Sequence, residues 1–220
     1  RPSPGGDVQY DIADFVTGQL FGTVPTSLVV LLVAVLVRWI VDADAAGDAA
    51  LRVRSRVAIG GALVHAARGR DEEGSTALHE ALTIGQDAYP TLAAAACREL
   101  GYVEFLRGRY ERAQVWLQRA TSLAEGDVLE QARIAIVHGS TLSDMAHYAQ
   151  ALALLRCGAE KARFAGDSRQ LAYALSMQGR ALLLCGELDA AAQILDDSMA
   201  LAQAGWTAFV PWPQALRAEV

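Results

Sequence analysis

Small and apolar residues recur along this chain at spacings typical of helices that pack in pairs. Three glycines are each followed twelve residues later by an alanine, and Ala62 with Gly74 forms a weaker first copy; the three pairs are Gly101 with Ala113, Gly139 with Ala151 and Gly179 with Ala191. The first members of the four pairs lie 39, 38 and 40 residues apart. Self-similarity at such a period is typical of stacked repeat proteins, in which each unit buries its apolar face against its neighbours. The pattern therefore predicts an all-α solenoid with a period of about 39 residues.

A leucine stands four residues after each small residue, and this spacing puts it on the same face of its helix. The four leucines are Leu78, Leu117, Leu155 and Leu195, and we expect them to form the ladder of the core. Glycine in the middle of a helix costs about 1 kcal/mol relative to alanine, so Gly101, Gly139 and Gly179 require a compensating contact. Close approach of each glycine to the alanine of the following helix supplies one.

The repeats are predicted to be helical hairpins. We expect their first helices at 51–68, 91–106, 129–145 and 168–184, and the repeats at about 51–86, 90–126, 128–166 and 168–204, with a partial fifth from 213. Gly69, Gly108 and Gly186 mark tight turns between the two helices of a hairpin, because glycine readily adopts the left-handed conformation that ends a helix. Ala146 takes this place in the third turn and is the one departure.

The chain is predicted to divide into an N-terminal segment, residues 1–45, and a repeat domain, residues 46–220. The segment holds a short amphipathic stretch, Tyr10–Leu20, and an apolar helix over 28–41 that is interrupted by Arg38. A membrane-spanning helix needs about 20 apolar residues, so we expect a buried helix that packs on the first repeat, with membrane association as the alternative. The polar stretch 42–48 indicates a linker.

Composition narrows the class of protein. Hydrophobic residues make up 53% of the 220 positions, and alanine and leucine, which favour helices, dominate. The net charge of −6 argues against a nucleic-acid surface, because phosphate binding depends on clustered Lys and Arg. Cys97, Cys157 and Cys185 lack metal-ligand spacing and no signal peptide is visible, so we expect reduced thiols in a cytoplasmic protein.

The repeat resembles the tetratricopeptide pattern, in which small and large apolar residues hold fixed positions in a helical hairpin. An aromatic or leucine position is taken by Tyr110, Tyr148 and Leu188, and a late small position by Ala81, Ala120, Gly158 and Ser198. The standard unit has about 34 residues, and here the extra length lies between repeats, as longer helices would give. The resemblance implies a right-handed superhelix of tetratricopeptide-like hairpins.

Longer phrases of the chain resemble the central region of the large ATP-binding LuxR-type, or MalT-like, transcription regulators. The phrases are 69–74, 97–102 and 206–213, and the resemblance covers roughly residues 50–220. Such regulators combine an N-terminal ATPase, a helical-repeat sensor and a C-terminal helix-turn-helix, which implies that this chain is a fragment containing the sensor. ATP is expected only in a missing N-terminal domain, because the single lysine, Lys161, follows Glu160 and not the glycine of a phosphate-binding loop.

The resemblance places the first helix of each hairpin on the concave surface of the superhelix. It directs nine residues toward that groove: Arg56, Arg98, Tyr102, Phe105, Arg133, Ser140, Asp144, Tyr173 and Arg180. Arginine offers planar, bidentate recognition of carboxylate or phosphate, so we expect an acidic peptide or a small anionic inducer to bind there. The alternative is that these arginines are solvated or pair with Glu99, Glu104 and Asp144.

No catalytic or metal-binding constellation stands out in the sequence. The four histidines are scattered, and adjacent acids such as Glu72 and Glu73 point about 100° apart on a helix. We expect a non-enzymatic sensor or protein-interaction module, without cofactor or metal, that couples inducer or partner binding to DNA binding elsewhere. The alternative is a stand-alone adaptor that holds a peptide, in one version tethered to a membrane. The incomplete last repeat, 213–220, exposes an apolar face through which copies could associate.

Overall fold

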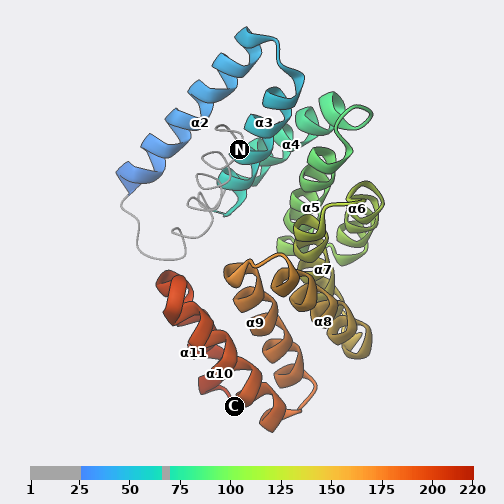
Figure 1. Ribbon diagram of the computed structural model, residues 1–220, viewed down its shortest axis with the longest axis vertical. Helices are drawn as coiled ribbons and strands as arrows, with labels where there is room; N and C mark the ends of the chain where they lie inside the picture. Colours follow the sequence, from blue (N-terminus) through green and yellow to red (C-terminus); the bar gives the residue numbers. More distant parts are fainter. Residues whose placement is uncertain (1–25, 66–69) are drawn as a thin grey trace. The chain divides into compact units, whose positions relative to one another are not determined.

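The computed structural model describes residues 26–65 and 70–220, and these residues are helical almost throughout. In chain order the elements are α2 (Thr26–Ala46), α3 (Ala49–His65), α4 (Asp71–Gly85), α5 (Pro90–Leu106), α6 (Tyr110–Leu123), α7 (Val128–Asp144), α8 (Tyr148–Phe164), α9 (Ser168–Leu184), α10 (Leu188–Gly205), the 3-10 helix η1 (Thr207–Phe209) and α11 (Pro211–Ala218) (Figure 1). The fold is therefore all-helical, as the sequence predicts. The stretch Tyr10–Leu20 and the turn at Gly69 lie outside the described residues.

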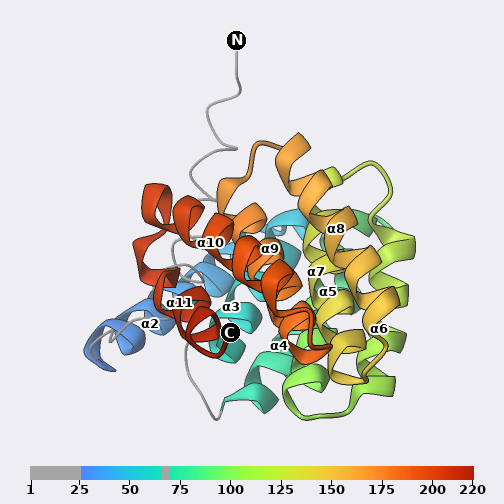
Figure 2. The same ribbon diagram turned by 90° about the horizontal axis from the view of Figure 1, so that it is seen from below.

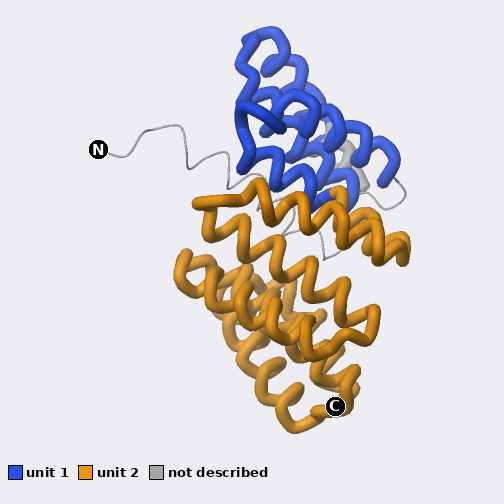
Figure 3. Tube along the Cα trace, turned by 90° about the vertical axis from the view of Figure 1, so that its right-hand side faces the viewer, with its two compact units in different colours: residues 1–99 blue, residues 100–220 orange. Residues whose placement is uncertain are grey.

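The chain divides into two compact units, residues 1–99 and residues 100–220 (Figure 3). We call them unit 1 and unit 2; the division falls within α5. In unit 1, α3 packs against both α2 and α4. In unit 2, α7 packs against α8 and α9 packs against α10, so helices adjacent in the chain form pairs (Figure 2). This pairing is that of a helical repeat protein.

The helices α5, α7 and α9 begin and end within one residue of the predicted first helices of their hairpins. Side-chain caps fix two of the starts. The carboxylate of Asp127 accepts a hydrogen bond from the backbone N–H of Glu130 at 2.8 Å, and Asp167 accepts one from Gln170 at 2.9 Å. Each such cap stabilises a helix by about 1 kcal/mol.

The tight turns adopt the left-handed backbone that the sequence predicts. The φ angles are 68° at Gly108, 85° at Gly186 and 60° at Ala146. After Ala146 the backbone N–H of His147 donates to the carbonyl of Leu142 at 2.9 Å, which closes the end of α7. Ala146 keeps the turn geometry although its Cβ makes this conformation unfavourable.

The mid-helix glycines have the close contact that the sequence requires of them. A Cβ on Gly139 would lie 2.6 Å from Cγ of Leu155, and the corresponding distances are 2.8 Å for Gly101 to Leu117 and 2.5 Å for Gly179 to Leu195. All three leucines, and Leu78 in unit 1, are fully buried, which confirms that the four leucines lie in the core. The closest contact of each glycine is thus a leucine and not the alanine named by the spacing; Ala113 and Ala151 contribute backbone oxygens.

The first hairpin differs from its predicted alignment. Gly60, and not Ala62, approaches the leucine ladder, because a Cβ on Gly60 would lie 2.6 Å from Cγ of Leu78. Five residues separate α3 from α4, whereas three separate the helices of each later hairpin. The glycine position therefore lies two residues earlier on α3. Counting twelve residues back from Gly74 gives Ala62, whereas the residue in contact with Leu78 is Gly60.

Helix α2 is longer than predicted and only one of its faces is buried. Leu36 packs against Ile59 and Leu63 of α3, as expected of a helix lying on the first repeat. The opposite face is exposed to solvent, with Leu31 at 60% and Val35 at 53%. Because α2 runs to Ala46, the predicted linker 42–48 shrinks to Gly47 and Asp48. Within the described residues, no helix is both long and apolar enough to cross a bilayer.

The C-terminal end of unit 2 packs through aromatic side chains. Phe209 is buried in a cluster with Ala172 and Ala202. The ring of Trp206 stacks on Phe209 at 4.3 Å, and Tyr173 meets the same ring edge-on at 5.9 Å. The predicted partial helix begins at Pro211 instead of 213, and both prolines lie in its first turn, where proline is well tolerated.

Candidate functional site

The nine residues predicted to line the groove, which we call the groove set, lie on α3, α5, α7 and α9. Arg56 and Ser140 are buried and the other seven side chains are half-buried. None of the nine is therefore a freely solvated side chain. Their contacts within each unit show what each is placed to do.

Arg56 holds three helices of unit 1 together. Its guanidinium donates to both carboxylate oxygens of Asp44 on α2, at 3.0 and 2.8 Å, and to Glu80 on α4 at 3.0 Å. The hydrogen bond with Asp44 raises the pKa of Arg56, and the same bond lowers the pKa of the Asp44 carboxyl. A buried arginine with this many carboxylate partners is satisfied without any ligand.

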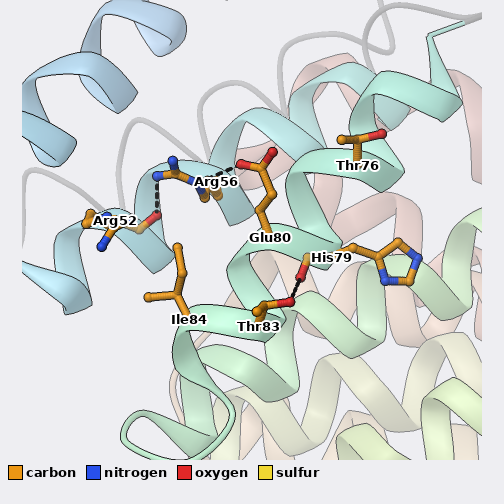
Figure 4. A pocket seen from close by; sticks show the side chains of 7 residues that line it. All are labelled: Arg52, Arg56, Thr76, His79, Glu80, Thr83 and Ile84. Atoms are coloured by element: carbon orange, nitrogen blue, oxygen red, sulfur yellow. Dashed lines mark hydrogen bonds and ion pairs between the residues drawn. The ribbon is translucent and has the colours of Figure 1, made fainter.

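Beside Arg56, α3 and α4 form an open surface depression of about 490 Å³ (Figure 4). Its lining combines positive, negative and neutral groups: Arg52, Arg56, Thr76, His79, Glu80, Thr83 and Ile84. The hydroxyl of Thr83 donates to the backbone carbonyl of His79 at 2.9 Å, so that proton is already used. The depression offers polar contacts of mixed charge to a partner side chain.

Sequence reasoning missed this depression because five of its seven residues lie on α4, a second helix, whereas the tetratricopeptide resemblance directs attention to the first helices. The available signal was a polar row at helical spacing. Thr76, Glu80 and Thr83 are four and three residues apart and share one face of α4.

A second charged cluster of unit 1 surrounds Glu99, which is 5% exposed. Its carboxylate is 2.8 Å from Nε2 of His65 and also pairs with the neighbouring Arg98. Burial alone raises the pKa of Glu99, but the attraction and hydrogen bonds of Arg98 and His65 outweigh it, so the pKa lies well below its usual range. Arg98 of the groove set therefore has the carboxylate partner that the alternative hypothesis gave it.

Two aromatic residues of the groove set lie together in unit 2. The rings of Tyr102 and Phe105 stack at 5.9 Å, and Phe105 also meets Tyr110 at 6.1 Å. Both Tyr102 and Phe105 pack against a buried cluster that includes Leu117 and Val137. They are partly exposed, so they combine core packing with a remaining apolar surface.

The polar members of the groove set in unit 2 also have partners. Arg180 on α9 pairs with Asp144 on α7, which brings two groove residues from neighbouring first helices together. Arg133 lies 3.8 Å from Glu130 one turn earlier on α7. The buried hydroxyl of Ser140 donates to the carbonyl of Ile136 at 2.8 Å.

Glu104, the third carboxylate of the alternative hypothesis, lies 3.7 Å from both Arg107 and Arg109, which are outside the groove set.

Burial lowers the pKa of His138. Within residues 26–65 and 70–220, no group of three or more His, Cys, Asp or Glu side chains is arranged to hold a metal ion. The groove set therefore offers a binding partner charged groups of both signs and aromatic rings, all of them on the first helices of the hairpins.

Comparison with known proteins shows a likeness in fold and gives no information on function. No family model matches the chain. No curated protein matches it either. Among solved structures it is similar to BtubC (BKLC) from P. vanneervenii, at 15% sequence identity and a TM-score of 0.67, over 85% of this chain and 82% of that chain. At this identity the likeness shows a shared fold alone.

Proposed function

We propose that this chain is a non-catalytic helical-repeat module that senses or binds a protein partner. The observation that carries the proposal is the recurring contact of a mid-helix glycine with a buried leucine of the next helix, at Gly60, Gly101, Gly139 and Gly179. Hairpins joined in this way stack into extended scaffolds whose surfaces bind other molecules. On this proposal the hairpins form a right-handed superhelical solenoid with a period of about 39 residues.

A peptide suits the groove set better than a small anion. Each of its four arginines, at 56, 98, 133 and 180, already has a carboxylate partner. A small anion has to displace such a carboxylate, so it gains only the difference between two charge-assisted interactions. A peptide adds apolar contacts with Tyr102 and Phe105 and hydrogen bonds from its own backbone, and these do not require displacement.

A peptide array tests this proposal. Acidic, basic and neutral peptides are probed with the labelled chain, and the affinity of each hit is measured by fluorescence anisotropy. We expect Arg180→Ala and Tyr102→Ala to weaken binding at least tenfold. Arg156→Ala makes the same change on an exposed part of α8 and should leave binding unchanged. An array without hits, or hits that respond equally to Arg156→Ala, would overturn the proposal.

For the biological setting, we propose the sensor region of an ATP-dependent LuxR-type, MalT-like regulator in the cytoplasm. The support is the resemblance of the phrases 69–74, 97–102 and 206–213 to that family. In this setting a peptide or inducer that favours one curvature of the solenoid shifts a population of states and thereby alters DNA binding by another domain. Sequencing the DNA that flanks the reading frame is the test. In-frame ATPase and helix-turn-helix regions are expected, and stop codons on both sides would exclude the regulator.

The second candidate is a stand-alone adaptor that uses the same groove to hold a peptide. The exposed apolar face of α2 favours it, because such a face is available for attachment to another surface. Flanking stop codons together with a positive peptide array would support the adaptor over the regulator.

A further inference from the structure

The outer face of α2 is an apolar strip with one ion pair in its middle. Leu31, Val35 and Val41 are 60%, 53% and 55% exposed. Arg38 and Asp42, one turn apart, pair at 3.0 Å with side chains 76% and 55% exposed. Exposed apolar residues grouped on one helix face, unlike single scattered ones, indicate a contact surface.

The charges of this strip are complementary to themselves. Arg38 and Asp42 project from the same face. When a second α2 is laid antiparallel, with the two-fold axis at the level of Ile40, each Arg38 faces the Asp42 of the other copy. A parallel arrangement would instead set Arg38 against Arg38 and Asp42 against Asp42.

The sizes of the side chains fit the same arrangement. Leu31 and Val35 are the large residues of one end of the strip, and the exposed small residues Ala45 and Ala46 form the other end. In the antiparallel pair Val35 of one copy lies over Ala45 of the other, so large residues fill the space above small ones. Interdigitation of large and small side chains is what close helix packing requires.

A lipid surface suits this face less well. Helices that lie on anionic membranes carry lysine and arginine on their polar side. The charged residues on the outer face of α2 are one arginine, Arg38, and one aspartate, Asp42, and they pair with each other. Asp44 instead faces the arginines of α3. The outer face is therefore neutral and offers no net attraction to anionic headgroups.

We propose that the chain forms an antiparallel homodimer through the outer face of α2, with Arg38 of each copy paired to Asp42 of the other. With the axis at Ile40 the two copies of α2 overlap over residues 34–46, a length of about 18 Å at 1.5 Å per residue. A single helix of this length buries less than the roughly 800 Å² per partner of a standard interface. The dimer is therefore weak, with a Kd of order micromolar. This inference is independent of the proposed peptide groove, because it involves no groove residue.

Sedimentation equilibrium of the full chain from about 1 to 500 μM measures the association. We expect a monomer–dimer equilibrium for the wild type. Val35→Asp should raise the Kd at least tenfold, because it places a charge in the apolar strip. Arg112→Asp changes the charge on an exposed part of α6 and should leave the Kd unchanged. Far-UV circular dichroism verifies that each variant keeps its helix content.

A charge exchange identifies the pairing. Arg38→Asp alone sets Asp against Asp at both contacts of the dimer, and Asp42→Arg alone sets Arg against Arg, so each variant should be monomeric. Mixed in equal amounts, the two should form a heterodimer, because every contact then joins Arg to Asp. Breaking the ion pair within the helix cannot produce this result.

Three results would overturn the proposal. The first is a wild type that stays monomeric at 500 μM. The second is a dimer that Val35→Asp does not weaken or whose charge variants fail to associate on mixing. The third is a monomer that floats with phosphatidylserine vesicles in a Val35-dependent way, which would make lipid the occupant of this face.

Discussion

Gly139 on α7 and Leu155 on α8 are so close that a Cβ on the glycine would lie 2.6 Å from Cγ of the leucine and 3.1 Å from the carbonyl oxygen of Ala151. Nonbonded carbon atoms do not approach to 2.6 Å, and a backbone oxygen cannot move aside as a side chain can. Two helices that touch at this point must separate if the glycine gains a side chain. The contact therefore sets the spacing of α7 and α8.

Gly139→Ala should destabilise the protein by about 1–3 kcal/mol, the usual cost of overpacking a core, despite the better helix propensity of alanine. The free energy of unfolding from urea titration measures the effect. Gly205→Ala is the matched control, because a Cβ at Gly205 would meet nothing within 4 Å, and it should be neutral or slightly stabilising. Equal effects of the two substitutions would contradict the role of Gly139.

Ala146→Gly should stabilise the protein by about 0.5–1 kcal/mol. Ala146 has φ 60°, in the left-handed region that costs an L-residue about 1–2 kcal/mol, and glycine removes this strain at a smaller cost in the entropy of the unfolded chain. Thermal unfolding measures the change. The reverse substitution Gly186→Ala, at φ 85°, should destabilise by a similar amount, and a stabilising effect there would refute the explanation.

Glu99 should make the stability depend on pH in the acid range. An unfolded glutamate titrates near pH 4.3, and in the folded protein the pKa of Glu99 is lower. Between these two pKa values the unfolded chain binds more protons than the folded one. The ionised Glu99 therefore stabilises the folded protein above about pH 5, and this stabilisation is lost as the pH falls further.

Glu99→Gln should cost about 2–4 kcal/mol at pH 7, because it removes the charge that faces Arg98 and His65. The difference in unfolding free energy between wild type and variant should shrink below about pH 4.5. Urea titrations at pH 7, 5 and 4 measure this difference. A gap that stays constant over the series would show that folding does not lower the pKa of Glu99.

The ion pair of Arg180 and Asp144 should show a coupling of about 1 kcal/mol in a double-mutant cycle of alanine substitutions. Its side chains are 27% and 15% exposed, so solvent screens the pair less than a surface pair. Arg217 and Asp196, with 39% and 54% exposed side chains, are the matched comparison and should couple by less than about 0.5 kcal/mol. Indistinguishable couplings would contradict the difference in burial.

The periodic parts of the fold could be predicted from sequence because they depend on local rules. The repeat period and the turn residues predicted the bounds of α7 and α9 to within a residue, and the conformational freedom of glycine predicted the turn at Gly186. The first hairpin could not be placed in the same way. Two additional residues between α3 and α4 shift the contact from Ala62 to Gly60, and only the packing against Leu78 reveals the shift.

The sequence predicted which residues belong to the candidate site, but not which carboxylates pair with its arginines. Spacing identified Arg56 and Arg180 as members of first helices, yet whether an arginine is available depends on tertiary neighbours such as Asp44, which lies in a stretch that looks like a linker. The aspartates of that stretch extend α2 because they face arginines of α2 and α3. Sequence patterns contain no information on such pairs until the helices have been placed.

Asp44 helps to hold α2 on α3 independently of the peptide chain that connects the two helices. It binds Arg52 and Arg56 of α3, while Leu36 of the same helix packs against α3 through apolar contacts. Helix α2 is therefore attached by more than the peptide bonds at Gly47 and Asp48. A protease that cleaves this short connection would leave a nicked protein whose two pieces stay together under native conditions and separate only in denaturant.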